Sequence, residues 1–293
     1  IIGCGLLGSS LLRCISKKKI AKKIFIYEKS KSNIRKIKKL RLPGIILKSL
    51  KEGVVNSDLI IFCTPMSEYK DIILKINSYV SSETLITDIG SSKIETSKII
   101  KKFLKKGVHW IQSHPIAGSE VSGPEHGKEN IFTNRWCIII KEYNTKQKNI
   151  NILTKFWKKI GSKVVVMSAE KHDKIFSITS HLPHLIAYNL VKSAQDFEKK
   201  QSYSLIRFSA GGLRDFSRIA ASNQIMWRDI FFNNKNNISK AIDLFIKNLS
   251  QFKKDINSNN NKSIIKKLIQ TKKVRSKIIK LRQDIDKPDF GRD

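Results

Sequence analysis

Three glycines near the start of the chain have the spacing of a phosphate-binding loop. Gly3, Gly5 and Gly8 stand in the run IIGCGLLGSSL, between a short apolar segment and an amphipathic one. In a strand-turn-helix unit, such glycines allow a tight turn, close approach of a pyrophosphate and close packing of the helix on its strand. The helix N-terminus then presents free N–H groups to the phosphates. The pattern predicts a dinucleotide site.

An acidic residue marks where the adenosine ribose would lie. Glu28 follows Gly8 by 20 residues, the spacing at which a carboxylate accepts hydrogen bonds from ribose hydroxyls. It would repel a 2′-phosphate, so the sequence favours NAD over NADP, although Lys29 and Lys31 oppose this preference. The alternative is a glycine turn without a ligand and an ordinary surface glutamate. The predicted cofactor site comprises Gly3, Gly5, Leu6, Leu7, Gly8, Glu28, Thr64 and Pro65.

The six histidines all lie between residues 109 and 184, and two of them have distinctive neighbours. His114 stands in SHPIAGSE and His184 in SHLPH. His114 follows the apolar run 108–113, so we expect it at the carboxyl end of a strand, where doubly wound sheets bind ligands. A single histidine is more often structural. The local density of Pro, Gly, Ser and Glu nevertheless indicates a functional site.

Two further segments carry polar groups suited to an anionic substrate. Ser91 stands on a predicted strand-to-helix turn in DIGSSK. Arg218 lies beside an Ile-Ala-Ala run, and burying its charge would be costly without an anion. Because a guanidinium binds a carboxylate through two parallel hydrogen bonds, Arg218 is a candidate carboxylate clamp. The alternative is a surface arginine whose stem packs on an apolar helix face.

Metal binding is the competing use of these histidines. His181 and His184 are three residues apart, and His172 with Asp173 would add ligands. Apolar helix separates the two pairs, however, and no cysteine or carboxylate completes a familiar zinc spacing. The four cysteines form no CxxC pair, which indicates neither a disulfide framework nor a zinc site and fits a reducing cytoplasm. We expect no metal site and a cytoplasmic protein.

The elements that would position these residues change type near residue 168. Before it, short apolar runs alternate with helical segments such as 67–79 and 92–106, which is typical of βαβ units and a parallel sheet. After it, the chain has the pattern of long amphipathic helices. We therefore predict a doubly wound, Rossmann-type α/β domain over residues 1–168 and an all-α domain over 169–293. The predicted strands are 24–27, 59–63, 84–89, 108–113, 136–142 and 163–168.

The composition is strongly basic, but the charge is diffuse. The 293 residues contain 57 Lys and Arg against 24 Asp and Glu, a formal charge of +33, and only 11 of the cations are Arg. A nucleic-acid binder clusters its cations, prefers Arg and interleaves aromatic residues. We therefore expect no nucleic-acid partner, although a positive field would attract an anionic substrate. No apolar run approaches the roughly 20 residues of a membrane span, so none is expected.

The chain resembles the prephenate/arogenate dehydrogenase family of tyrosine biosynthesis. The resemblance runs from residue 1 to about residue 235 through GCGLLG, Glu28, DIGSSK, HPIAGSE, KHD, SHLPH and GGLRDFSRIAASNQIMWRD. It implies NAD-dependent oxidative decarboxylation of prephenate to 4-hydroxyphenylpyruvate, of arogenate to tyrosine, or of both. It also implies that the helical domain binds substrate and forms a homodimer through interlocking helices.

The resemblance also implies roles for single residues. His114 would draw off the proton of the substrate hydroxyl as a carbonyl develops, and Ser91 would share that hydroxyl or orient the nicotinamide. Arg218 would hold the ring carboxylate. The family often has Asp at Glu28, and often has Asp-Pro or Asn-Pro where this chain has Asn223-Gln224, a change expected to relax a helix start near the pocket. The residues expected around the substrate are Arg218, His184, Glu120, His172 and Trp227.

Two alternative functions remain open at the level of sequence. A β-hydroxyacid dehydrogenase of the same layout would use a lysine of the helical domain, and no motif nominates one. A non-catalytic, basic NAD-binding protein would not need His114, Ser91 and Arg218 together. The sequence leaves the choice between prephenate and arogenate open. Its length leads us to expect no fused chorismate mutase and no regulatory domain.

Overall fold

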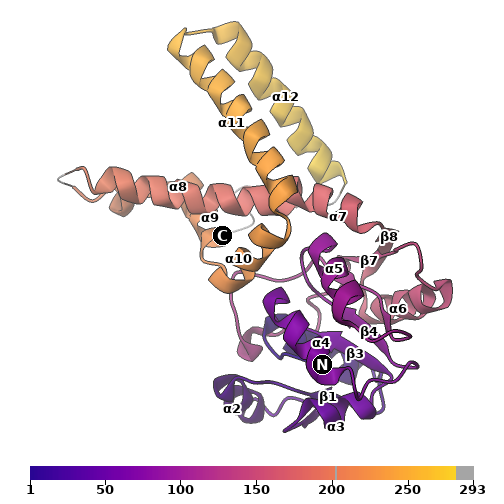
Figure 1. The fold of residues 1–293 in the computed structure, drawn as a ribbon. Coiled ribbons are helices and arrows are strands. Elements are labelled where there is room, and N and C mark those ends of the chain that lie inside the picture. The colour runs from indigo at the N-terminus through magenta and orange to yellow at the C-terminus, as the bar shows by residue number, and fades with distance from the viewer. Residues whose placement is uncertain (202, 282–293) are drawn as a thin grey trace.

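The chain consists of an α/β part followed by a group of long helices (Figure 1). The computed structural model describes residues 1–201 and 203–281, so residues 282–293 of the predicted helical domain lie outside the described residues. The last strand, β8 (Lys163–Met167), is followed directly by α7 (Ala169–Phe176). Strands therefore stop where the apolar runs of the sequence stop.

The main sheet is built around Ile2. This residue bridges Tyr27 on one side and Phe62 on the other, so it joins two groups of parallel strands. The resulting order is β2, β1, Ile2, β3, β4, β5, which is the order of a doubly wound dinucleotide-binding sheet. The predicted fold class is confirmed. The strands are β1 (Phe25–Ile26), β2 (Ile45–Ile46), β3 (Leu59–Phe62), β4 (Leu85–Asp88) and β5 (His109–Trp110).

A second sheet carries His114. It contains β6 (Ser113–Pro115), β7 (Trp136–Ile140) and β8, with β6 antiparallel to β7 and β7 parallel to β8. The prediction of one strand over 108–113 is therefore wrong, and His114 lies within β6 rather than after a strand. The chain changes sheets here because the Ile111 N–H still donates to β4, whereas the Gln112 carbonyl accepts from Ile140 of β7.

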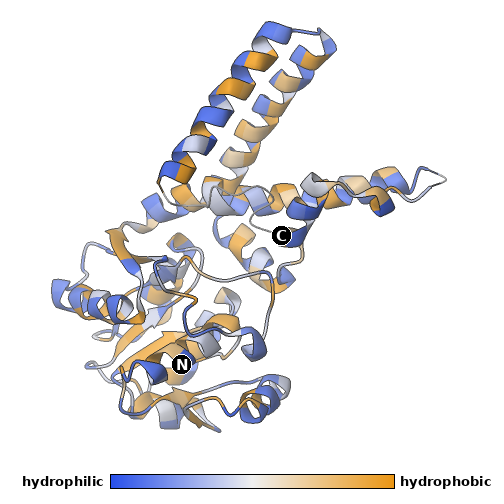
Figure 2. Cartoon of the chain, turned by 180° about the vertical axis from the view of Figure 1, so that it is seen from behind, coloured by the Kyte–Doolittle hydropathy of each residue, from blue (hydrophilic) through white to orange (hydrophobic). Residues whose placement is uncertain are grey.

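Helices cover both faces of the α/β part, and the apolar strands form its interior (Figure 2). Helix α1 begins directly after the glycine loop and buries Leu11, Leu12 and Ile15 against the sheet. Because a buried parallel strand is apolar on both faces, these strands stand out in the sequence as continuous apolar runs. The helices of this part are α1 (Leu6–Lys17), α2 (Lys31–Lys39), α3 (Leu50–Val55), α4 (Tyr69–Ile76), α5 (Ile94–Phe103) and α6 (Gln147–Ile160), with short turns η1 (Met66–Glu68) and η2 (Pro124–His126).

In the helical part, α8 extends as an arm and α11 with α12 projects as a hairpin (Figure 1). Many apolar side chains of this hairpin are about half exposed, including Leu244, Leu249 and Leu268. No described helix is long and apolar enough to cross a membrane. Besides α7, this part contains η3 (Ser177–His181), α8 (Leu182–Glu198), η4 (Ile206–Phe208), α9 (Gly211–Ala220), α10 (Gln224–Asn233), α11 (Lys235–Asn257) and α12 (Asn261–Lys280).

Candidate active site

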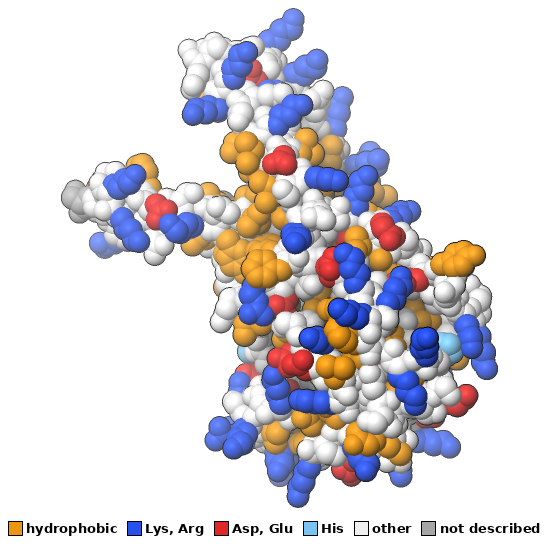
Figure 3. All heavy atoms as spheres, viewed as in Figure 1, with side chains coloured by type: hydrophobic (Ala, Val, Ile, Leu, Met, Phe, Trp, Pro, Cys, Tyr) orange, Lys and Arg blue, Asp and Glu red, His pale blue; other side chains and the backbone are white. Residues whose placement is uncertain are grey.

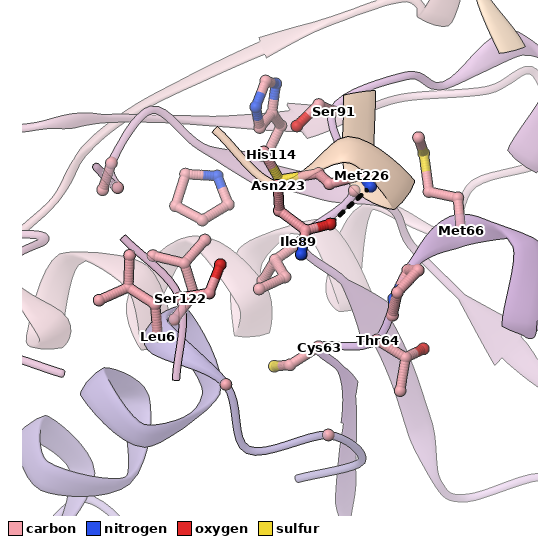
Figure 4. A pocket seen from close by; sticks show the side chains of 18 of the residues that line it. Leu6, Cys63, Thr64, Met66, Ile89, Ser91, His114, Ser122, Asn223 and Met226 are labelled. Atoms are coloured by element: carbon pink, nitrogen blue, oxygen red, sulfur yellow. Dashed lines mark hydrogen bonds between the residues drawn. The ribbon is translucent and has the colours of Figure 1, made fainter. Parts of the chain in front are cut away.

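A cavity of about 2000 Å³ runs from the glycine loop to the helical part. Figure 4 shows Ser91 and His114 at one end of it and Leu6 and Thr64 toward the glycine loop. Two predicted site residues, Gly8 and His172, do not line this cavity. The predicted residues that line it are Gly3, Gly5, Leu6, Leu7, Glu28, Thr64, Pro65, Ser91, His114, Glu120, His184, Arg218 and Trp227.

The three glycines of the loop meet different surroundings. Gly3 has φ +89°, and a Cβ there would lie 2.9 Å from the backbone of Cys63. A Cβ on Gly8 would lie 2.2 Å from the carbonyl oxygen of Gly3, so this glycine serves the packing of α1 on its strand. A Cβ on Gly5 would meet nothing within 4 Å. Gly5 therefore leaves the space that a pyrophosphate needs to approach the backbone.

The N-terminus of α1 is suited to a phosphate. The helix begins at Leu6, its N-cap is Gly5, and no side chain caps it. The first N–H groups of a helix have no intrahelical partner and carry the positive end of its dipole. Because Leu6 and Leu7 of this first turn line the same cavity as Gly5, the loop fits the diphosphate of a dinucleotide.

Glu28 is fixed in place before any ribose binds. Its carboxylate accepts from the backbone N–H of Cys4 at 2.8 Å and of Ser30 at 2.8 Å. Lys29, which was considered a possible partner for a 2′-phosphate, forms an ion pair with Glu68 at 2.7 Å instead. A negative group held here disfavours the additional phosphate of NADP.

We expect alanine substitutions at Gly5 and Gly8 to separate cofactor binding from folding. Gly5→Ala should fold normally, because the backbone there is extended and the space open, and should raise the KM for NAD about tenfold by obstructing the pyrophosphate. Gly8→Ala should instead lower the free energy of unfolding by about 1–3 kcal/mol, because the added methyl group overpacks the helix–strand contact. Steady-state kinetics and thermal unfolding measure the two effects. Unchanged NAD affinity in Gly5→Ala would mean that the pyrophosphate lies elsewhere.

At the other end of the cavity, His114 begins a chain of buried hydrogen bonds. Its Nδ1 lies 2.8 Å from Nε2 of His172, and Nδ1 of His172 lies 2.8 Å from Oδ1 of Asp173. The Asp173 carboxylate also accepts from the backbone N–H groups of Lys93 and Ile94, each at 2.9 Å. His114 is 8% exposed, and His172 and Asp173 are fully buried.

These contacts set the tautomer of His114. An ionised Asp173 can only accept, so His172 must donate from Nδ1 and keep a lone pair on Nε2. That lone pair accepts from Nδ1–H of His114, which leaves Nε2 of His114 as an acceptor. His114 lines the cavity, so the arrangement provides a neutral imidazole able to take a proton from a bound hydroxyl.

Burial, together with the charges around it, keeps His114 neutral. Burial lowers its pKa well below the ordinary value of 6.5, and His172, Lys93 and His181 lower it further. Burial and Lys93 likewise lower the pKa of His172 well below 6.5. Burial raises the pKa of Asp173, but the N–H donors of Ile94 and Lys93 oppose that effect. A base of this kind is ready at neutral pH without first losing a proton.

Three of the predicted substrate residues, His184, Arg218 and Trp227, line the cavity from helices α8, α9 and α10. His184 stacks on Trp227 with ring centroids 3.8 Å apart, and it lies just after the π-helical turn η3. Arg218 is not buried: its side chain is 55% exposed and lies 3.3 Å from Glu120. The cost of burying an unpaired guanidinium therefore does not arise. Arg218 and Glu120 form a charged pair that lines the cavity.

Two expectations for this region need correction. His172 does not line the cavity, because it lies behind His114 and orients that ring. The start of α10 is not relaxed, since Asn223 accepts from the Met226 N–H at 3.0 Å and caps the helix without a proline (Figure 4). Because Asn is among the best N-cap residues, α10 keeps a well-formed N-terminus without a proline.

Sequence reasoning missed three buried charged residues that support the site. Asp88, Lys93 and Asp173 stood in the quoted motifs, but no role in orienting His114 was assigned to them. Lys93 and Asp88 are fully buried and form an ion pair at 2.7 Å. The available signal was an Asp at the end of an apolar strand and a Lys five residues later. Within the described part of the chain, no group of three or more His, Cys, Asp or Glu residues is arranged to hold a metal ion.

Comparison with known families gives two matches that divide the chain between them. Residues 12–166 match the model of the prephenate dehydrogenase nucleotide-binding domain, and residues 168–270 match that of the prephenate dehydrogenase dimerization domain. A cyclohexadienyl dehydrogenase of Zymomonas mobilis is 30% identical over 275 residues, covering 94% of each chain. A prephenate dehydrogenase of Bacillus subtilis is 32% identical over 255 residues, covering 86% of this chain and 68% of the relative.

Solved structures resemble the chain over nearly its whole length. A prephenate dehydrogenase of Aquifex aeolicus in complex with hydroxyphenyl propionate and NAD+ superposes with a TM-score of 0.88 at 30% identity, covering 94% of this chain and 96% of that one. An arogenate dehydrogenase of Synechocystis has a TM-score of 0.77 at 20% identity over 94% of this chain and 98% of that one. At that identity the second likeness shows the fold alone.

Proposed function

The chain belongs to the prephenate dehydrogenase family, whose members are NAD-dependent oxidoreductases of tyrosine biosynthesis, and we propose that it oxidatively decarboxylates prephenate, arogenate or both. One observation carries the assignment of the site: the buried chain Asp173–His172–His114 ends in a cavity that begins at the glycine loop. Such an arrangement would bring a base and a dinucleotide bound at the glycine loop to one small molecule in the same cavity.

The reaction divides between His114 and the cofactor. NAD held at the glycine loop and Glu28 would supply the acceptor for a hydride from the carbinol carbon of the substrate ring. As that hydride leaves, Nε2 of His114 takes the hydroxyl proton, and the oxygen becomes a carbonyl. The ring carboxylate then departs as CO₂, its bonding electrons aromatise the ring, and the oxygen recovers the proton from His114. The Asp173 carboxylate supports the imidazolium that forms between these two events.

The remaining predicted residues hold the substrate in this proposal. Arg218 binds the ring carboxylate, and Ser91 contacts the hydroxyl or orients the nicotinamide. His184 and Trp227 form a stacked wall of the cavity, against which an apolar ring packs well. Because Arg218 and Glu120 are already adjacent, an incoming carboxylate would have to compete with Glu120 for the guanidinium.

Formation of NADH with each substrate tests the proposed function. We expect NAD-dependent absorbance at 340 nm with prephenate, arogenate or both, and weaker turnover with NADP because Glu28 repels its 2′-phosphate. Prephenate and arogenate differ by a pyruvyl against an alanyl side chain, so parallel kinetics also reveals the preference. Absence of NADH with both substrates, in a protein that still binds NAD, would refute the proposal.

We further propose that the chain works as a homodimer. Residues 168–270 match a dimerization domain, and the α11–α12 hairpin exposes Leu249 and Leu268. Figure 3 shows apolar side chains gathered where the hairpin meets the α8 arm. Exposed apolar faces of this kind are usually buried against a partner. Light scattering should therefore give a molar mass of about twice the 33.6 kDa of one chain. A monomer at micromolar concentration would contradict the proposal.

A further inference from the structure

Lys93 is a lysine whose side chain is entirely buried beneath the site. It lies two residues after Ser91 and directly before α5. Burying an ammonium group is costly unless it is paired and hydrogen-bonded. Its Nζ donates to Oδ2 of Asp88 at 2.7 Å and to the carbonyl oxygen of Ser113 at 2.7 Å. The second acceptor belongs to the residue just before His114.

Asp88 is held by neighbours other than Lys93 as well. Its Oδ2 accepts from the Gly90 N–H at 2.9 Å, and its Oδ1 accepts from Nε1 of Trp110 at 3.2 Å. Tyr69 donates to the same carboxylate at 3.4 Å. Asp88 therefore fixes the turn that leads to Ser91, and this carboxylate does not depend on Lys93 alone.

The backbone of Lys93 reaches the opposite end of the hydrogen-bonded chain. Its N–H donates to Oδ1 of Asp173, the same oxygen that accepts from His172. One residue thus contacts the carbonyl before His114 and the carboxylate that orients His172. Both contacts are buried, so water cannot replace them readily.

We propose that Lys93 is a positioning residue for the base His114. Its ammonium group fixes the strand that carries His114, and its positive charge opposes protonation of the imidazoles of His114 and His172. This inference rests on the proposed function only in calling His114 the base. Lys93 itself does not line the cavity, so it acts through His114 rather than on substrate.

The charged and titratable groups around His114 agree with this role. His172 and Asp173 lie on α7, His181 on η3 and Cys137 on β7. Lys93 lies directly before α5, and its partner Asp88 ends β4. After burial, the charge of Lys93 contributes to the lowered pKa of both His114 and His172. Burial raises the pKa of Cys137 well above its ordinary value, so this thiol supplies no charge.

The test removes the charge without leaving Asp88 unpaired. In the double variant Lys93→Met/Asp88→Asn, we expect kcat to fall about tenfold or more through misplacement of His114. The acidic limb of the kcat/KM profile should move to higher pH, because His114 becomes easier to protonate. The matched control is Lys98→Met, an exposed lysine of α5, the helix that follows Lys93, which should leave both quantities unchanged. A double variant with the limb unmoved and kcat within about twofold of the wild type would overturn the proposal.

A measurement on the wild-type protein makes the test independent of variant folding and of turnover. Titration of the His114 imidazole by NMR should give a pKa well below 6.5. A value at or above 6.5 would overturn the proposal even if the double variant failed to fold. If the protein formed no NADH from either substrate, the proposed function would fail, and comparison of the His114 pKa in the wild type and in the double variant would still show whether Lys93 opposes protonation of His114.

Discussion

His114→Asn is expected to lower kcat by about 10²- to 10⁴-fold, the contribution typical of a positioned general base. An asparagine side chain has no atom that accepts a proton near neutral pH, so the developing carbonyl would lose its proton to water. The KM for NAD should stay within about twofold of the wild-type value, because His114 belongs to β6 and the glycine loop is intact. Steady-state kinetics with the better substrate measures both parameters.

The matched control for this prediction is His126→Asn. His126 lies in η2, its side chain is 45% exposed, and it does not line the cavity. Its replacement should leave kcat and the thermal stability unchanged. Near-normal turnover in His114→Asn would show that another group takes the hydroxyl proton, and the chemistry assigned to the Asp173–His172–His114 chain would then be wrong.

The same histidine links stability to pH in a defined direction. Burial lowers the folded-state pKa of His114 well below the 6.5 of the unfolded chain, so between those two values the unfolded state binds more protons. The contribution to stability is complete above pH 6.5 and is lost as the pH falls toward the folded pKa. Activity carried by neutral His114 should likewise persist at pH 6.5 and decline only below it.

The fold was predictable because its strands are buried on both faces. Continuous apolar runs such as 59–63 and 84–89 correspond closely to β3 and β4, since parallel strands covered by helices need no polar alternation. Strand β2 has only two residues, too few to form a pattern. The split of 108–113 depended on pairing with two different sheets, which local sequence does not encode.

The residues of the candidate site could be predicted only where they stand within a distinctive local sequence motif. His114 stands among Pro, Gly and Ser, so its neighbours mark it, and the glycine loop has a fixed spacing. The supporting residues have no such mark: Lys93 and Asp173 meet although 80 residues separate them. A buried charge looks like any other charge in a sequence that carries 57 Lys and Arg. The folded structure, and not the sequence, shows that Lys93 is buried away from solvent.

The second large effect is expected from Asp173→Asn, which changes no atom that reaches the substrate. Two backbone N–H groups, from Lys93 and Ile94, donate to this carboxylate together with His172. An amide has one acceptor oxygen. His172 and the Lys93 N–H share Oδ1, whereas the Ile94 N–H uses Oδ2. An NH₂ group at the Oδ1 position therefore faces both His172 and Lys93, and Nδ1 of His172 must then accept while its Nε2 carries the proton; in either orientation the imidazolium of the reaction loses the carboxylate that supports it.

That change reverses every hydrogen bond up to the cavity. With Nε2 of His172 protonated, Nδ1 of His114 must accept, and Nε2 of His114 then carries a proton and cannot act as a base. We expect kcat to fall about 10²- to 10⁴-fold, the range lost when a general base is removed, with the KM for NAD nearly unchanged. Asp255→Asn, which removes a carboxylate of the α11–α12 hairpin, should leave kcat unchanged.

The outcome of Asp173→Asn distinguishes a role of Asp173 in orienting the imidazoles from a role in stabilising the protein alone. Leaving the N–H of Lys93 or Ile94 without its acceptor should also lower the free energy of unfolding, by about 1–3 kcal/mol. Thermal unfolding and NAD binding therefore need to be measured on the same preparation as kcat. A variant that is folded, binds NAD and keeps more than about a tenth of wild-type kcat would show that Asp173 stabilises the protein without setting the tautomer of His114. A folded variant that binds NAD but has lost its turnover would show that the carboxylate sets the state of the base, although two imidazoles separate it from the substrate hydroxyl.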